Sequence, residues 1–406
     1  MDWRARFPGV SDAEWRDWRW QLRHALRSEA ELAGLVELTA DERAGLALGG
    51  LRTGVTPYYA ALMDPLHPAC PARRQVIPLA AEGLGAAGDL LDPTGEETHR
   101  PVRAVVHKYP DRALFLVTDT CPIYCRHCTR RRITGGDDGA FDRAAIDEGI
   151  AWVAAHREVS DVIVSGGDPL VLSDERLDEV LGRLRAIPHV RVLRLATRAP
   201  AVLPMRVDAT LAAMLRRHAP LFVVTHFNHP KELTPEARAA CETLVDHGVP
   251  VENQAVLLRG LNSSARTLAA LFSTLLTWRV RAYYLHQGDL AAGTGHLRTP
   301  LTVGVELLRQ LRGKVAGLAI PQLAVDLPDG SGKVILAPDY VARASPPGSA
   351  AGAAGWPRGD GGTWLVNHHG RRVLYPDPPG ADCACPYDAV YFGTGPAADP
   401  AGGPAT

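Results

Sequence analysis

The sequence predicts an α/β fold built on a parallel sheet. From about residue 113 onward, short β-branched runs alternate strictly with amphipathic helical segments. Such alternation is typical of parallel strands joined by right-handed crossovers. The chain has 406 residues, of which 46% are hydrophobic, so it is long and apolar enough for one large α/β domain with appendages.

Six strands are expected, each a short apolar run. They lie at residues 113–118, 161–165, 190–197, 221–227, 251–258 and 282–287. Helical patterns lie near 143–157, 174–187, 209–217, 235–247 and 265–278, and a further one follows at 303–313. Thr234-Pro235 opens one helix and Gly248 closes it, as capping preferences require. This alternation leaves open whether the sheet is doubly wound or a partial barrel.

The regions on either side lack this alternation. Residues 1–100 are expected to form a mostly helical N-terminal region, in which Ser11 and Glu14 have the spacing of a capping box. Residues 101–342 hold the alternating segments. Residues 343–406 are rich in Gly, Ala and Pro, and we expect a linker, a small C-terminal subdomain and a disordered tail.

Composition argues against several classes of partner. A net charge of −1 does not favour nucleic acid or a membrane surface, since both usually need a basic excess. No run of 18 apolar residues predicts a membrane span, and the N-terminus lacks the apolar segment of a secretory signal. Seven cysteines do not make a disulfide framework. We therefore expect a cytoplasmic protein whose partner is a small molecule.

Three cysteines follow the first expected strand directly. Cys121, Cys125 and Cys128 have C-x3-C-x2-C spacing. Three thiolates can ligate three irons of a [4Fe-4S] cluster and leave the fourth iron open. The amino and carboxylate groups of S-adenosyl-L-methionine (SAM) can chelate such an iron. A zinc knuckle fits less well, because zinc sites prefer two-residue spacings and four protein ligands.

Polar residues follow the other strands as well. They are Ser165-Gly166-Gly167-Asp168, Thr197-Arg198, Thr225 to His229, Asn253-Gln254 and His286 to Asp289. Any one of these groups has an ordinary explanation as a turn or a cap. Because ligands of parallel α/β folds bind at the carboxyl ends of the strands, their presence at every strand favours one shared pocket.

A glycine-containing loop, VDLPDGSGK, ends at Lys333. It lacks the spacing of a nucleotide-binding P-loop. A lysine held beside the apolar run that follows can have a lowered pKa and form a Schiff base. A solvated surface lysine is the ordinary alternative.

Together these motifs resemble the lysine 2,3-aminomutase family, which uses both SAM and pyridoxal 5′-phosphate (PLP). The resemblance spans roughly residues 65–340. It rests on HKYPDR (107–112), TDTCPIYCRHCTRRR (118–132), SGGD (165–168), THFNHP (225–230), QGDL (287–290), HLRTP (296–300) and VDLPDGSGK (325–333). It implies a six-stranded partial (βα)6 barrel of radical SAM type. It also implies an isomerase that moves the α-amino group of an L-amino acid to Cβ.

The resemblance also implies roles for residues around the cofactors. Lys333 looks like the lysine that forms the Schiff base with PLP. Arg112, with Tyr109 nearby, resembles the anchor of the PLP phosphate. The residues expected on the SAM side are Gly166, Gly167, Asp168, His226 and Gln254.

Three further residues resemble the family's substrate contacts. Arg130 looks like the partner of the substrate α-carboxylate, and Asp289 and Asp326 resemble two acids that hold a distal cationic group. A cationic substrate follows, with L-lysine, giving β-lysine, as the first choice. L-arginine, giving β-arginine, is the alternative, because a guanidinium can pair with two carboxylates. Asp329 adds a third acid where lysine enzymes of the family typically have Gly.

The sequence departs from the family at its structural zinc site. Cys383 and Cys385 match two ligands, but Asp388 stands at the third position and Ser264 at the fourth. Two thiolates and an aspartate make a weaker zinc set, so zinc is doubtful. The resemblance still implies a homo-oligomer, and a one-electron reductant such as flavodoxin or ferredoxin.

Two other functions remain open from the residues. One is a radical SAM enzyme that does not use PLP, and Lys333 and Arg112 argue against it. The other is a non-catalytic iron-sulfur electron carrier, which would leave the lysine loop and the strand-end motifs without a purpose.

Overall fold

A computed structural model of the chain describes residues 3–134, 141–341, 358–359, 362–367 and 369–376. The chain divides into two compact units, Met1–Ala337 and Pro338–Thr406. Most of the expected linker and the whole expected tail lie outside the described residues. So do Cys383, Cys385 and Asp388 of the doubtful zinc site.

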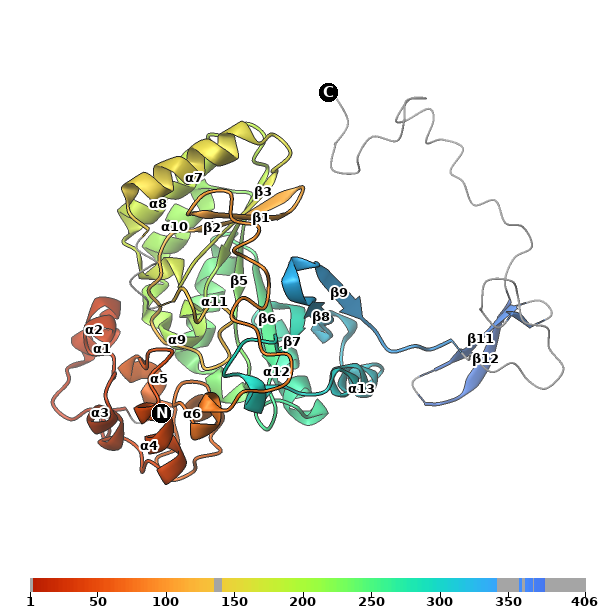
Figure 1. Cartoon of the computed structure of the whole chain (residues 1–406), viewed down its shortest axis with the longest axis horizontal. Helices are drawn as coiled ribbons and strands as arrows, with labels where there is room; N and C mark the ends of the chain where they lie inside the picture. Colours follow the sequence, from red (N-terminus) through yellow and green to blue (C-terminus); the bar gives the residue numbers. More distant parts are fainter. Residues whose placement is uncertain (1–2, 135–140, 342–357, 360–361, 368, 377–406) are drawn as a thin grey trace. The chain divides into compact units, whose positions relative to one another are not determined.

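The first unit contains a nine-stranded sheet whose strands follow one another in chain order (Figure 1). Strands β2 to β8 are parallel, and the edge strands β1 and β9 are antiparallel to their neighbours. The strands are β1 (Val105–Tyr109), β2 (Arg112–Leu116), β3 (Asp161–Ser165), β4 (Val192–Ala196), β5 (Leu221–Thr225), β6 (Val251–Leu257), β7 (Arg281–Gln287), β8 (Gln322–Asp326) and β9 (Lys333–Leu336).

The α/β class and the mostly parallel sheet are confirmed, and all six expected strands are present as β2 to β7. The count of six is not confirmed, because the sheet has nine strands among the described residues. The strands that the sequence did not predict are β1, β8 and β9. β1 and β9 each form a hairpin with a neighbouring strand. No helix separates them from that neighbour, so the alternation of strands and helices does not reveal them.

Helices cover one face of this sheet. They are α7 (Arg143–Ala155), α8 (Asp174–Arg185), α10 (Ala209–Arg217), α11 (Pro235–Asp246), α12 (Ala265–Thr277) and α13 (Leu301–Leu311). Figure 1 shows α7, α8 and α10 together on one side of the strands. Close packing explains Gly149 on α7, since a Cβ there would lie 2.8 Å from the ring of Phe115 on β2. Alternate residues of each strand therefore face the helices, and the others face the opposite side.

The described part of the N-terminal region contains six short α-helices. These are α1 (Asp12–Arg16), α2 (Trp18–Arg23), α3 (Glu29–Ala33), α4 (Ala40–Ala47), α5 (Pro57–Ala61) and α6 (Pro71–Arg74). The capping box of Ser11 and Glu14 is formed at the start of α1. Thr56 donates a hydrogen bond to the carbonyl of Val202 at 2.7 Å, which ties this region to the connection between β4 and β5.

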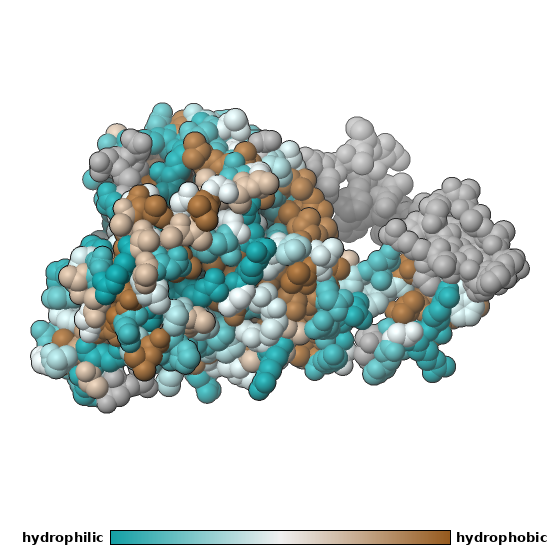
Figure 2. Space-filling view, turned by 60° about the horizontal axis from the view of Figure 1, so that its bottom comes forward, coloured by the Kyte–Doolittle hydropathy of each residue, from teal (hydrophilic) through white to brown (hydrophobic). Residues whose placement is uncertain are grey.

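Hydrophobic and hydrophilic residues are interspersed on the face shown in Figure 2. Several exposed large apolar residues of the first unit, such as Leu66 and Leu91, are far apart in the sequence, whereas Val334 and Ile335 on β9 are adjacent. Every helix in the described part of the chain is too short or too polar to span a bilayer.

The second unit contains a three-stranded antiparallel sheet of β10 (Arg358–Gly359), β11 (Gly362–Val366) and β12 (Arg372–Pro376). Its main hairpin turns at Gly370, whose φ of 78° lies in the left-handed region that favours glycine.

Candidate active site

A cavity of about 560 Å³ lies on the inner face of the first unit's sheet. Alternate residues of the strands line it, for example Arg112 and Leu114 on β2 and Tyr284 and His286 on β7. The volume lies within the usual range for small-molecule sites. The cavity brings together every candidate site residue predicted from the sequence: Tyr109, Arg112, Cys121, Cys125, Cys128, Arg130, Gly166, Gly167, Asp168, His226, Gln254, Asp289, Asp326 and Lys333.

The cysteine loop directly follows β2 and is held by its neighbours. The amide of Cys128 donates to the carbonyl of Cys125 at 3.0 Å. Between them, buried Arg126 pairs with Glu82 through Nε at 2.7 Å and Nη2 at 2.5 Å. Burial, together with the neighbouring thiols, raises the pKa of both Cys121 and Cys128.

No set of three or more His, Cys, Asp or Glu side chains in the described ranges is arranged around a single metal ion. The three cysteines nevertheless fit a four-iron cluster, because each thiolate then binds a different iron and the sulfurs need not converge on one point.

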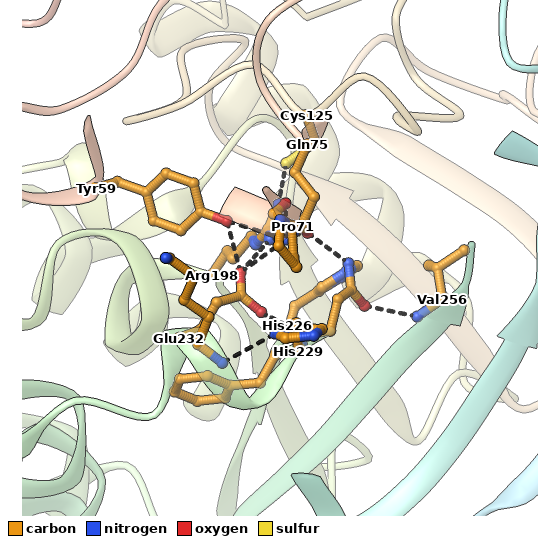
Figure 3. Close-up of polar contacts among 12 residues, drawn as sticks. Tyr59, Pro71, Gln75, Cys125, Arg198, His226, His229, Glu232 and Val256 are labelled. Atoms are coloured by element: carbon orange, nitrogen blue, oxygen red, sulfur yellow. Dashed lines mark hydrogen bonds and ion pairs between the residues drawn. The ribbon is translucent and has the colours of Figure 1, made fainter. Parts of the chain in front are cut away.

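Arg198, just after β4, contacts this loop (Figure 3). Its Nη1 donates to Sγ of Cys125 at 2.7 Å. Its Nη2 donates to Oε1 of Gln75 at 2.5 Å and to Oε1 of Glu232 at 2.7 Å. Tyr59 also donates to Glu232, at 2.7 Å. Arg198, Gln75, Glu232 and Tyr59 are buried. Their contacts form one network that joins the N-terminal region, two strand-end loops and the cysteine loop.

The glycines after β3 allow two loops to meet. Gly166 has a φ of +131°, and a Cβ there would lie 2.2 Å from the carbonyl oxygen of Thr118. A Cβ on Gly167 would lie 2.2 Å from the oxygen of Thr120. The resemblance placed these glycines on the SAM side of the site. In the structure, they make room for the backbone of Thr118 and Thr120, in the segment that precedes Cys121.

Asp168 accepts hydrogen bonds from the loop after β4. One carboxylate oxygen accepts from the Thr197 hydroxyl at 2.7 Å and from the Leu170 amide at 3.0 Å. The other accepts from the Arg198 amide at 2.8 Å. Burial raises the pKa of this carboxyl. Asp168 therefore fixes the position of Arg198.

Two histidines lie beside the cysteine loop. The rings of His127 and His226 stack with centroids 5.2 Å apart, and their Nε2 atoms are 3.3 Å apart. Burial lowers the pKa of both imidazoles well below the usual value, so both are neutral. Nδ1 of His127 is buried and has no hydrogen-bond partner among the described residues. It is therefore available to a ligand in the cavity.

Lys333 and Asp326 face each other across the β8–β9 hairpin, where they are paired residues. Nζ of Lys333 lies 2.5 Å from Oδ2 of Asp326 and 3.4 Å from Nδ1 of His286. The turn requires glycine, since Gly330 and Gly332 have φ values of 75° and 100°. The loop that the sequence predicted is thus a hairpin that points its terminal lysine into the cavity.

Arg112 and Tyr109 lie at the β1–β2 hairpin. The Arg112 guanidinium lies 4.1 Å from the centroid of the Tyr109 ring. The Tyr109 hydroxyl is buried and, in the part of the chain that the structure describes, has no partner. Arg112 also pairs with Asp111 at 3.3 Å. A cation next to a free hydroxyl is suited to an anionic group such as a phosphate.

Arg130 and Asp289 complete the polar lining. Nε of Arg130 donates to Oε1 of Glu96 at 2.8 Å and Nη1 donates to the Ser165 hydroxyl at 3.5 Å, and Arg130 lines the cavity. Burial and the nearby charge of Asp326 raise the pKa of Asp289 to about 7. A cation between the two acids would remove this repulsion.

Comparison with known proteins agrees with this geometry. Residues 115–271 match the Radical SAM superfamily. The L-lysine 2,3-aminomutase of Fusobacterium nucleatum is 46% identical over 342 residues, which cover 84% of this chain and 80% of that protein. The chain belongs to the lysine 2,3-aminomutase family. The L-lysine 2,3-aminomutase of Clostridium subterminale is likewise 46% identical, over 82% of this chain and 81% of its own length.

A glutamate 2,3-aminomutase, from Clostridioides difficile, is 38% identical over 82% of this chain and 79% of its own length. Members of the family are isomerases, and their chemistry uses a [4Fe-4S] cluster, SAM and PLP. The cavity fits these groups, with three thiolates for the cluster, a free buried hydroxyl beside Arg112 for a phosphate, and a free imidazole nitrogen on His127.

Sequence reasoning missed several residues that hold this site. Arg198 stood out only as part of a strand-end pair, while Gln75, Glu232 and Glu96 carried no signal, because they act through contacts between distant segments. His286 was noted as a strand-end residue, but its contact with Lys333 could not be expected without the hairpin.

Proposed function

We propose that this chain converts L-lysine to β-lysine by moving the α-amino group to Cβ. The observation that carries the proposal is the pair of acids, Asp289 and Asp326, in one cavity with Lys333 and Arg130. Two carboxylates suit a substrate with a cationic side chain and repel a glutamate side chain. The relatives named L-lysine 2,3-aminomutase at 46% identity support the same substrate.

In this proposal each cofactor has its own residues. Cys121, Cys125 and Cys128 would hold the cluster, and Lys333 would hold PLP, with Arg112 and Tyr109 at the phosphate. Gly166, Gly167, Asp168, His226 and Gln254 would border SAM. When bound, the cluster supplies the electron that cleaves SAM, and PLP carries the migrating amino group.

The protein itself would bind and orient the substrate and shield the reaction from water. Arg130, held by Glu96, would bind the substrate α-carboxylate as a charge-assisted pair. Asp326 is paired with Lys333 here, so it must leave Lys333 before it binds the substrate's distal cation. Exchanging one cation for another avoids leaving a buried carboxylate unpaired, which is costly. The cavity walls keep water away from reactive species.

We also propose how the chain divides this work. Strands β2 to β7 within residues 101–342 would act as the six-stranded partial barrel that carries all three cofactors. Residues 1–100 would support the cysteine loop through Gln75 and Glu82. A cellular one-electron reductant, such as flavodoxin or ferredoxin, would feed the cluster, and the protein would work as a homo-oligomer in the cytoplasm.

The test is a direct comparison of substrates. The enzyme, anaerobically reconstituted with iron, sulfide, SAM, PLP and a reductant, is incubated side by side with L-lysine, L-arginine and L-glutamate. We expect the 3-amino product from lysine with the highest kcat/KM. Asp326→Asn should lower kcat/KM for lysine about 100-fold or more, because an unpaired buried cation costs roughly 3–5 kcal/mol.

A matched control is Asp246→Asn, which removes an exposed carboxylate on α11. It should leave lysine turnover unchanged. Preferred turnover of glutamate, or equal lysine turnover in the Asp326 variant and the control, would overturn the proposal.

A further inference from the structure

The contact between Arg198 and Cys125 links a buried cation to an expected cluster ligand. The guanidinium donates to Sγ at 2.7 Å, and Arg198 is only 8% exposed. Its Nε is also buried and, within the described residues, has no hydrogen-bond partner. One donor of this side chain thus already binds a cluster ligand, and a second is free beside it.

Other contacts hold Arg198 in this place. Asp168 accepts from its backbone amide at 2.8 Å, while Gln75 and Glu232 accept from Nη2. A planar guanidinium fixed at several donors keeps its orientation better than a lysine ammonium would. The charge beside Cys125 is therefore a fixed feature of the site.

Glu232 sets how much of this positive charge acts on the sulfur. It is fully buried, and its Oε1 lies 2.7 Å from Nη2 of Arg198. Oε2 accepts from the amides of Asn228 and His229 at 2.7 and 2.9 Å. In a low-dielectric interior, charges at this range interact strongly. The carboxylate therefore opposes the effect of the guanidinium.

We propose that Arg198 is a positioning residue that raises the reduction potential of the cluster, and that Glu232 limits this effect. Reduction adds one electron to the cluster. The added negative charge strengthens a hydrogen bond to a ligand sulfur and is stabilised by a nearby cation, and such contacts are among the factors that set iron-sulfur potentials. The inference rests on the proposed function, because it requires the cluster at Cys121, Cys125 and Cys128.

The two residues predict shifts of opposite sign. In Arg198→Gln, the reduced cluster loses a cation, and the equilibrium constant for one-electron reduction should fall about tenfold, which is about 59 mV for a one-electron couple. In Glu232→Gln, the guanidinium is no longer offset, and the potential should rise. Arg198→Lys keeps the charge and should lie between wild type and Arg198→Gln. Loss of packing alone would not be expected to produce this order of reduction potentials.

The measurement is a potentiometric titration of anaerobically reconstituted full-length protein without SAM, followed by the electron paramagnetic resonance signal of the reduced cluster. Iron content is measured for each variant. The matched control is Arg206→Gln, because Arg206 is also a buried arginine but donates to the Leu170 carbonyl and to Asp174 and has no hydrogen bond to a cysteine in the described chain. Its potential should equal that of wild type.

The outcomes separate this inference from the proposed function. A wild-type protein that holds no four-iron cluster, or that does not cleave SAM, refutes the proposed function. If wild type passes and Glu232→Gln raises the potential while Arg198→Gln or Arg198→Lys lowers it, the inference stands. Shifts of the same sign in the Glu232 and Arg198 variants, or potentials equal to that of the Arg206 control, refute the inference alone. If Arg198→Gln holds no cluster, the Arg198→Lys and Glu232→Gln measurements decide.

Discussion

Replacing Asp289 by Asn should make the cofactor-free protein more stable and should lower kcat/KM of the loaded enzyme for lysine. Asp289 lies in the cavity, where burial and the charge of Asp326 raise its pKa from 3.8 to about 7. Holding this carboxylate charged therefore costs stability. At 1.36 kcal/mol for each pKa unit, the cost is at most about 4 kcal/mol, and water entering the cavity reduces it.

The direction in which stability changes with pH follows from proton binding. Because its folded pKa is raised, the folded protein holds a proton on Asp289 between about pH 4 and 7 that the unfolded chain has released. Stability thus falls as pH rises through this window, and the full cost is present above pH 7. Asn is neutral at every pH. The stability advantage of Asp289→Asn should therefore be small near pH 4 and largest at pH 8.

The assay is urea unfolding of cofactor-free protein at pH 5, 6, 7 and 8, with Asp246→Asn as the exposed control. The control should show no comparable pH-dependent gain. In the loaded enzyme, Asp289→Asn should lower kcat/KM for lysine. A variant that is less stable than wild type at pH 8, or a stability difference that does not change with pH, would refute the reasoning.

Three other results are expected. In the wild-type enzyme, kcat/KM for lysine should decrease as pH falls below about 7, because Asp289 becomes protonated in the free enzyme, and Asp289→Asn should lose that dependence; a pH profile is the measurement. Borohydride should fix PLP to Lys333, as peptide mapping would show, and Arg112→Ala should weaken PLP binding about 10- to 100-fold in a spectroscopic titration, because a charge-assisted pair contributes roughly 1.5–3 kcal/mol. Cys241→Ala should keep iron content and SAM cleavage, whereas both should be lost on alanine substitution at any of Cys121, Cys125 and Cys128.

Much of the fold could be predicted because its elements have strong local signals. Helices and strands differ in hydrophobic period, and the caps mark their ends, as Thr234 and Gly248 do for α11. The edge strands β1 and β9 could not be predicted in this way, since each is short and pairs through a hairpin. Neither strand is set off from its partner by a helix, so the alternation of strands and helices that predicted β2 to β7 does not reveal them.

The site was predictable to the extent that topology alone gathers residues. Parallel strands bring their carboxyl ends together, so residues after each strand were expected to share a pocket, and at least one residue from each of these groups lines the cavity. Contacts between segments remote in sequence had no such signal. Glu96 beside Arg130, and Gln75 and Glu232 beside Arg198, depend on where loops and the N-terminal region pack.

The two ends of the nine-stranded sheet meet at a seam. Among the described strands, β1 and β9 are the edges, yet the Tyr109 hydroxyl at the end of β1 lies 4.0 Å from where a Cβ on Gly332 would stand, just before β9. No backbone ladder joins β1 to β9 among the described strands, so these two edges should separate at lower cost than any inner pair of strands. A ligand held by Arg112 and Lys333 together would connect the two edges of the sheet. Binding of such a ligand should therefore stabilise the closed arrangement of the two edges.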